Sequence, residues 1–557
     1  MDIMAANDFI YDDLHNDEDS SYEHEDFLDS YGDDSDYYDH MTMMGSNSEH
    51  TMNELFFHCI EPTLRDVWWQ FLLPILATNF IAIILFTLLI IVVMRSTRMK
   101  QFQFIISESI LIISGYSLLL HHYSSNNFDQ LLFLTSVIII SSIFVSVLLA
   151  FDIHNGLHFI WPLHLLFIGL NEILIFFYDS SDWIKLRPNL MLLLMKSISY
   201  FHEIRISMEK KDIKNSGSFI RNFKFIILQY SAYVLHPCAI ILGIWHPHND
   251  HSKLFITNHN NNDETRTKNF KQNIIQSFGS LFFSLLFLIC STCLIDYFFG
   301  HILFEYLDSF IRIFFADDPQ QTSTFWFFIM KILRSYSIAI QFHYSHYFIC
   351  FLGQSMFHLW GFDDLQVTKP LSIEWPRSLV DVVVAWNIPM HQWLKRYVFQ
   401  VMKNNLKNIY LTILATYFIS SYLHGFNFQI WTVLLTLGLI TQAEFKLRKS
   451  LAHFWSACVE SRKCQYDYYV YDDDDDDDNY SLVCRHGHRK TKNIWIVRII
   501  NLFFTLLALF HLAFLGATFD GQPDSSSVEN VWTVWKDLHF YPFITMIIMF
   551  VLYKMIS

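Results

Sequence analysis

The chain has 557 residues, of which 52% are hydrophobic, 17% are aromatic and only 17% are charged. Soluble globular proteins carry about a quarter charged residues, so this composition excludes an ordinary soluble domain and indicates a membrane protein. The net charge of −16 argues against a nucleic-acid partner, because nucleic-acid binding requires a basic face.

The acidic residues are concentrated at the beginning of the chain. The first fifty residues contain 16 Asp or Glu and no Lys or Arg, which equals the net charge of the whole chain. Such a composition cannot bury enough apolar area to fold. We therefore expect a disordered acidic tail over residues 1–52, followed by one membrane domain over residues 53–557.

Apolar runs of about twenty residues, the length that crosses a bilayer, follow the tail. Because helices satisfy their backbone hydrogen bonds internally in lipid, the sequence predicts an all-α polytopic membrane protein. We expect roughly eleven membrane helices plus re-entrant pieces. The expected segments are 67–94, 103–121, 130–150, 157–178, 188–204, 225–245, 273–298, 325–352, 379–400, 408–424, 427–444, 494–516 and 538–556, of which 379–400 is too polar for a simple span.

The charged segments between the apolar runs predict the orientation of the protein in the membrane. Lys and Arg cluster at residues 95–100, 205–224, 395–407 and 446–492. By the positive-inside rule these loops are cytosolic, which places the acidic tail in the lumen. The Asp-rich polar loop at 465–490 is expected to be solvated and mobile rather than a calcium site, whose ligands are spaced. The Asn/His-rich stretch 246–262 is also expected to be a loop.

The eight cysteines predict neither redox chemistry nor a metal site. Cys290 and Cys293 have CxxC spacing, but they lie in an apolar segment. There we expect them to pack as small hydrophobic residues. The three Cys and two His between residues 458 and 488 are too irregularly spaced to favour zinc.

Two polar residues in apolar surroundings are candidates for chemistry. His424 ends an apolar run that begins at Ile409, and Asn387 precedes Pro389 in the broken segment. Ionisable groups at membrane depth are costly and usually functional. A neutral imidazole is a general base, and an amide can donate to an oxyanion or hold a thioester carbonyl. The alternative is that His424 ends a helix at the membrane interface and Asn387 caps or packs.

These positions lie in segments that resemble the membrane-bound O-acyltransferase family. Residues 369–394 resemble its Trp-Asn signature, and residues 421–426 resemble its catalytic histidine segment. The porcupine branch is the most similar, through residues 442–449, 456–464 and 510–520. Residues 186–199 and 334–348 fit more loosely. The resemblance covers about residues 55 to 557 and is absent from the acidic tail.

The resemblance implies an acyltransferase with a helical core that encloses an acyl-transfer tunnel. It implies transfer of a palmitoleoyl group from its CoA thioester to a serine of Wnt proteins, in the endoplasmic reticulum membrane. Palmitoleoyl-CoA is then a substrate, and no bound cofactor or metal is expected. His424 becomes the general base and Asn387 its partner. The expected acyl-CoA contacts, each of which has ordinary packing as an alternative, are Trp386, Tyr422, Tyr336, Phe342, His343 and Ser421.

Other functions remain open from the residues alone. One is a membrane O-acyltransferase that acts on a lipid or sterol. Another is a channel or transporter with His424 as a proton relay, although the sequence has no visible internal repeat of the kind many transporters show. Residues 401–408 look longer than the matching family segment. This extra length is expected in a cytosolic turn, and it puts in doubt which residues meet the CoA.

Overall fold

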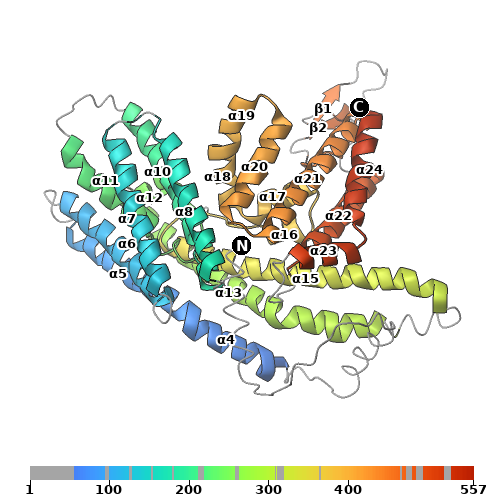
Figure 1. The fold of residues 1–557 in the computed structure, drawn as a ribbon, viewed down its shortest axis with the longest axis horizontal. Coiled ribbons are helices and arrows are strands. Elements are labelled where there is room, and N and C mark those ends of the chain that lie inside the picture. The colour runs from blue at the N-terminus through green and yellow to red at the C-terminus, as the bar shows by residue number, and fades with distance from the viewer. Residues whose placement is uncertain are drawn as a thin grey trace.

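The computed structural model describes most of the chain from residue 55 onward (Figure 1). The described residues are 55–93, 100–123, 128–151, 153, 155–178, 181–210, 219–256, 263–307, 309, 319–362, 365–463, 467–471, 480–484, 488, 494–519 and 528–557. The predicted acidic tail and the Asp run at 472–478 lie outside these residues.

The first half of the described chain forms a group of packed helices, on the left in Figure 1. Helix α6 contacts α5 and α11, α7 contacts α11, and α8 contacts α10. The elements are the π-helical turn η1 (Phe56–Ile60), α4 (Glu61–Val67), η2 (Trp68–Leu72), α5 (Leu73–Val93), α6 (Lys100–Tyr123), α7 (Phe128–Ala150), α8 (Leu157–Tyr178), α9 (Ser181–Ile184), α10 (Arg187–Lys210), α11 (Phe219–Val234) and α12 (His248–Ile256).

Two long helical stretches run side by side from the centre of the molecule, beneath the remaining helices (Figure 1). They consist of α13 (Asp263–Ile289) with η6 (Cys290–Leu294) and η7 (Tyr297–Phe304), and of α15 (Pro319–Leu359). Helix α15 also contacts α22 of the last group. Gly516 on α22 permits close packing, because a Cβ there would lie 2.4 Å from the Cβ of Ala339 on α15.

The remaining helices stand on α15 in two adjoining groups (Figure 1). The central group is α16 (Pro370–Glu374), α17 (Leu379–Trp386), α18 (Ile388–Trp393), η8 (Leu394–Phe399), α19 (Gln400–Leu406) and α20 (Ile409–Leu423). The last group is α21 (Phe428–Trp455), α22 (Trp495–Gly516), α23 (Val528–Asp537) and α24 (Tyr541–Ile556). Helix α21 joins the groups by packing against both α20 and α24.

The prediction of a helical polytopic membrane protein is confirmed. Among the described residues, seven helices are long and apolar enough to cross a membrane: Glu61–Leu85, Phe104–Tyr123, Phe128–Ala150, Leu157–Tyr178, Lys271–Leu307, Phe428–Trp455 and Trp495–Gly516. The pair Val531–Asp537 and Tyr541–Ile556, bent by 71°, is an eighth if it acts as one span. The expected count of roughly eleven is not confirmed, because several expected segments are too polar, too short or broken at a turn.

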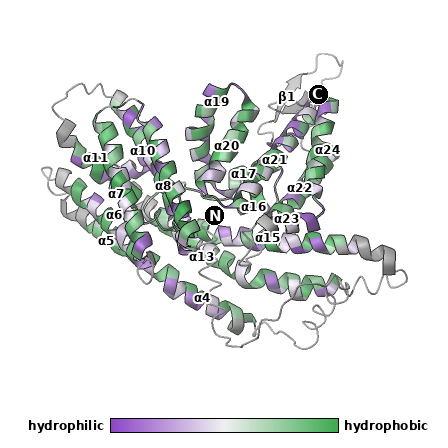
Figure 2. Cartoon of the chain, in the orientation of Figure 1, coloured by the Kyte–Doolittle hydropathy of each residue, from purple (hydrophilic) through white to green (hydrophobic). Residues whose placement is uncertain are grey.

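Helix α7 shows how these helices divide between lipid and protein. Its isoleucines Ile139 and Ile143 are about half exposed, whereas Ser141, Ser142 and Ser146 are buried inside the bundle. Small residues allow helix backbones to approach closely within a membrane, and apolar side chains can face lipid without cost. In Figure 2 the ribbon of these helices is accordingly coloured as hydrophobic over much of its length.

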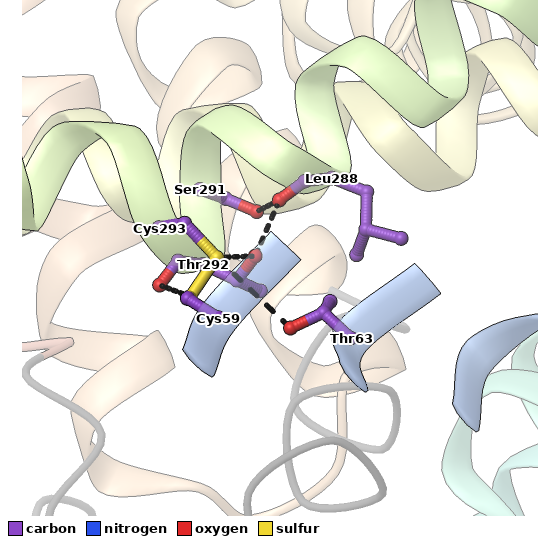
Figure 3. Close-up of a disulfide and its surroundings, with 6 residues drawn as sticks. All are labelled: Cys59, Thr63, Leu288, Ser291, Thr292 and Cys293. Carbon is purple, nitrogen blue, oxygen red and sulfur yellow. Dashed lines mark hydrogen bonds between the residues drawn. A yellow bond between two sulfur atoms is a disulfide. The ribbon is translucent and has the colours of Figure 1, made fainter. Parts of the chain in front are cut away.

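A disulfide between Cys59 and Cys293 ties η1 to η6 (Figure 3). The expectation that Cys293 packs as a free hydrophobic residue was therefore wrong, whereas Cys290 is free. Cysteine spacing misled here because the partner lies 234 residues away, beyond the reach of any local motif. Disulfides persist in oxidising compartments such as the lumen of the endoplasmic reticulum.

Two expected loops contain regular structure. Part of the Asn/His-rich stretch forms α12, and His248 and His251 are buried there because their rings pack on Tyr233. The Asp-rich polar loop at 465–490 contains two antiparallel strands, β1 (Asp467–Tyr471) and β2 (Tyr480–Cys484). Their Tyr and Val residues have high strand propensity, but the acidic run between the strands dominated the local composition.

Arg448 on α21 holds the beginning of α17 in place. Its guanidinium is fully buried and donates to the carbonyl oxygens of Val459 (2.8 Å), Arg377 (2.7 Å) and Glu460 (3.1 Å). The remaining bonds reach the side chains of Glu444 (3.3 Å) and of Asn501 on α22 (2.7 Å). All five N–H groups of the guanidinium thus have an acceptor.

The other members of this network complete the attachment. Glu444 accepts a hydrogen bond of 3.0 Å from the backbone N–H of Leu379, the first residue of α17. Arg377 donates to the carbonyl oxygens of Cys458 and Glu460. Segments that are far apart in the sequence, at 377–379, 444–448 and 458–460, therefore form one buried cluster.

We expect loss of the disulfide to destabilise the protein. Cys293→Ser should lower the melting temperature in detergent, because a native disulfide contributes about 2–5 kcal/mol. The wild-type melting temperature should fall on reduction, whereas that of Cys293→Ser should not change. Cys290→Ser is the matched control and should behave as the wild type. A wild-type melting temperature that is insensitive to reduction contradicts the disulfide.

Replacement of Arg448 should destabilise the protein strongly. Arg448→Lys keeps the charge but removes two of the five donors, so that buried carbonyl groups lose their partners. Breaking a buried charged network costs about 3–5 kcal/mol. Thermal unfolding in detergent measures this loss. The neighbouring exposed Lys449→Ala should leave the melting temperature unchanged, and an equal effect of both variants would show that Arg448 has no special role.

Candidate active site

The Trp386-Asn387 element forms a break between two short helices. Helix α17 ends at Trp386, Asn387 has an extended backbone (φ −139°, ψ 92°), and α18 begins at Ile388. The Oδ1 atom of Asn387 accepts from the backbone N–H of Met390 at 3.0 Å and so caps α18. Pro389 fits the first turn of α18, where no backbone donor is needed. The segment 379–400, expected to be too polar for a simple span, thus contains a broken helix.

The segment before α16 supplies hydrogen-bond partners for the backbone around this break. The carbonyl oxygen of Val367 accepts from Ile388 N–H at 2.8 Å. The carbonyl oxygen of Ala385 accepts from the N–H of Lys369 at 3.1 Å and from the hydroxyl of Thr368 at 3.0 Å. A helix can be interrupted at membrane depth only where the protein satisfies the freed backbone groups.

Side chains of α15 surround the indole of Trp386. Its ring stacks on the imidazole of His346 (centroids 4.3 Å apart, 4° between planes) and lies edge-on to His343 at 5.2 Å. Phe342 lies at 5.8 Å and stacks in turn on Phe519 at 4.1 Å. In addition, Nε2 of His346 donates to the carbonyl oxygen of Trp386 at 2.8 Å. The predicted residues Trp386, Phe342 and His343 are therefore brought together.

Glu374 binds the other side of His343. Its carboxylate accepts from Nδ1 of His343 (3.0 Å) and from the hydroxyls of Tyr347 (2.6 Å) and Tyr336 (3.5 Å). Burial alone would raise the pKa of Glu374, but His343, Tyr347 and Tyr336 together hold that pKa below its usual value. Sequence reasoning named Tyr336 and His343 but missed Glu374 and His346. The acidic side chain between the apolar residues Ile373 and Trp375 was the available signal for Glu374.

His424 lies at the end of α20, where the chain turns toward α21. It is the C-cap residue, with its N–H bonded to the carbonyl of Ser421 at 3.1 Å. Gly425 follows with a φ of +79°, a conformation that favours glycine. A Cβ at Gly425 would also lie 2.3 Å from Glu172 and 2.7 Å from Arg187. The backbone beside His424 thus packs directly on the side chains of these two residues.

Glu172 and Arg187 form a buried ion pair with two hydrogen bonds, both 2.7 Å long. Such bidentate pairing fixes the relative position of the two side chains. It links α8 to the beginning of α10 immediately beside Gly425. Neither residue was among the sequence candidates, although a carboxylate inside the apolar segment 157–178 is a signal for function.

The other two α20 candidates have structural partners. The hydroxyl of Ser421 is buried and donates to the carbonyl of Tyr417 at 3.0 Å within the helix. Tyr422 reaches α8, where its hydroxyl donates to the carbonyl of Leu165 at 3.4 Å, and its ring packs edge-on to Phe426. Residues 401–408, expected as a lengthened turn, instead lie mostly in α19, and Asn408 caps α20.

The candidate residues therefore form two groups. One group, on α15 and at the break between α17 and α18, contains Tyr336, Phe342, His343, Trp386 and Asn387. The other, at the end of α20, contains Ser421, Tyr422 and His424. Within the described part of the chain, no hydrogen bond joins Asn387 to His424, and no three His, Cys, Asp or Glu side chains gather as metal ligands. The cap uses only the amide oxygen of Asn387, so the cap leaves the amide nitrogen available as a donor.

The part of the chain that contains both groups is similar to known proteins. The model of the MBOAT, membrane-bound O-acyltransferase family, matches residues 147–458, which is more than half of the chain and includes both groups. The protein-serine O-palmitoleoyltransferase porcupine of Homo sapiens is 31% identical over 373 residues, covering 65% of this chain and 70% of the relative. The porcupine proteins of Mus musculus and Anopheles gambiae are each 30% identical, with 65% of this chain and 70% and 67% of the relatives covered. The chain belongs to the membrane-bound O-acyltransferase family.

Proposed function

We propose that this protein is a protein-serine O-acyltransferase that transfers a palmitoleoyl group from its CoA thioester to a serine of a Wnt protein. The observation that carries this proposal is the similarity to porcupine proteins at 30–31% identity over 65% of the chain. Those relatives are named protein-serine O-palmitoleoyltransferases. The family match also includes both candidate groups, Asn387 with Trp386 and His424 with its neighbours.

In the proposed reaction, His424 is the general base. Its imidazole takes the proton of the acceptor serine hydroxyl as the oxygen attacks the thioester carbonyl. The new C–O ester bond forms, the C–S bond breaks, and the departing CoA thiolate receives the proton from the imidazolium. The products are the acylated serine and free CoA. No nucleophile of the enzyme is needed, because the acceptor supplies the attacking oxygen.

Asn387 is proposed to hold the thioester carbonyl. Its Oδ1 is occupied by the N–H of Met390, so its Nδ2 hydrogens are oriented and free to donate to the carbonyl oxygen. A donor that is held in place before the reaction stabilises developing negative charge more effectively than one that must reorient. The cap thus supports the proposed role, and the two interpretations of Asn387, structural and catalytic, are compatible.

The site is proposed to lie in the membrane of the endoplasmic reticulum. The protein is a multi-pass membrane protein, and its Cys59–Cys293 disulfide requires an oxidising compartment on one side. Acyl-CoA comes from the cytosol, whereas a secreted acceptor is in the lumen. A buried site that opens to both sides allows the two substrates to react without either crossing the bilayer.

Replacement of His424 tests its proposed role as the general base. His424→Ala should lower acyl transfer by about a hundredfold or more, the usual contribution of a positioned general base. Transfer of a labelled acyl group from palmitoleoyl-CoA to a Wnt peptide, with purified enzyme in detergent or liposomes, measures the change. His453→Ala is the matched control, because His453 is exposed near the end of the next helix, and it should retain full activity.

Two outcomes of this assay would contradict the proposal. Full activity of His424→Ala, with the variant folded, would exclude His424 as the base. Transfer by the wild type to a lipid or sterol, but not to the Wnt peptide, would show that the acceptor is not a protein. A series of acyl-CoA donors that differ in length and unsaturation, tested in the same assay, defines the donor.

Asn387→Asp separates the cap from the proposed catalytic role. Asp caps helices as well as Asn does, so the melting temperature should stay close to that of the wild type. The carboxylate cannot donate to the thioester oxygen, so transfer should fall by about a hundredfold, the loss seen when one oxyanion donor is removed. An active Asn387→Asp enzyme would show that Asn387 has only a structural function.

A further inference from the structure

The proposed reaction gives no role to Glu374, yet only the side chain of His343 separates Glu374 from Trp386. His343 contacts both, with its Nδ1 on the carboxylate at 3.0 Å and its ring edge-on to the indole at 5.2 Å. The side chain of His343 is only 4% exposed, and that of Glu374 is 18% exposed. The orientation of this imidazole is therefore determined by the protein.

Helix α15 presents two adjoining faces to this part of the chain. Tyr336, His343 and Tyr347, spaced by seven and four residues, lie on one face and hold the carboxylate of Glu374. Phe342 and His346, one turn apart, lie on the next face and stack with Trp386. His343 contacts both the Glu374 carboxylate and the Trp386 indole. The Glu374 carboxylate therefore fixes the positions of α16 and of the indole against α15.

Trp386 is also the residue before the break. Its carbonyl accepts from His346, and the preceding carbonyl, that of Ala385, accepts from Lys369 at the beginning of α16. A displacement of α16 or of His343 would thus move the indole and its stack with Phe342. In an acyl-transfer site, this aromatic surface is suited to lie against the acyl chain, and its position would decide which chain shapes fit.

We propose that Glu374 is a positioning residue that sets acyl-chain selectivity, by fixing through His343 the place of the Trp386 indole. This inference rests on the proposed acyl-transfer function and adds a specificity determinant to it. Glu374 does not act on the thioester. It holds one wall of the site, so its loss should affect chains that differ in shape to different extents.

The test compares two donors that differ only in the cis double bond. For each of palmitoleoyl-CoA and palmitoyl-CoA, kcat/KM for transfer to the Wnt peptide is measured with the wild type and with Glu374→Gln. We expect the ratio of kcat/KM for palmitoleoyl-CoA to kcat/KM for palmitoyl-CoA to be about tenfold lower in Glu374→Gln than in the wild type. This is the size of effect that a change in pocket contacts produces. The loss for palmitoleoyl-CoA should appear mainly in KM, and Glu374→Asp should restore part of the ratio.

A purely structural role predicts a different result, because a smaller folded fraction lowers both rates in proportion. Glu108→Gln, which alters a fully buried carboxylate on α6, is the matched control and should leave the ratio unchanged. Where Glu374→Gln yields too little folded enzyme, Tyr347→Phe removes only the 2.6 Å hydrogen bond and should shift the ratio in the same direction.

The outcomes are distinct. An unchanged ratio in a folded Glu374→Gln or Tyr347→Phe enzyme overturns the role of Glu374 while acyl transfer by the wild type stands. Absence of transfer by the wild type overturns the proposed function and this inference together. A lowered ratio, with the Glu108→Gln ratio unchanged, supports both.

Discussion

The break at Asn387 depends on one constraint, which is that backbone groups inside an apolar protein must have hydrogen-bond partners. Ending α17 at Trp386 and beginning α18 two residues later would leave several such groups without partners. The Asn387 side chain, the Val367 carbonyl and the Thr368 hydroxyl supply them. The interruption is thereby stable at a depth where lipid offers no hydrogen bond, and it presents an amide side chain inside the molecule.

Buried charges hold the chain before this break at two points. Arg448 and Glu444 attach the beginning of α17, and Glu374 attaches α16 to α15. Buried ionic groups stabilise a fold weakly overall, but they are costly to separate once they are formed. They therefore favour one arrangement of the segment over others. A polar segment that must hold a substrate carbonyl gains from this, since small displacements of a reacting group lower rates strongly.

The sequence pointed to this segment, to His424 and to two of the ring neighbours of Trp386, Phe342 and His343. Polar residues in apolar runs are conspicuous because burial without partners is costly. It missed Glu374, Arg187 and the partner of Cys293, since each acts through contacts with residues far along the chain. The hairpin β1–β2 was missed because the acidic run dominated the local composition. The expected segment 379–400, which carries polar residues, contains the candidate residues Trp386 and Asn387.

The sequence by itself determined the membrane class, the helical architecture, the segment 379–400 as one that is not a simple span, and the resemblance to an acyltransferase family. These properties follow from local patterns, namely apolar runs, proline and asparagine positions, and short motifs. Only the tertiary structure decided which residues surround Trp386, why Gly425 must be glycine, and which cysteines pair. Those features arise where segments far apart in the sequence come together: α15 with α17, the turn at Gly425 with α8 and α10, and η1 with η6. Such contacts depend on packing that no local pattern encodes.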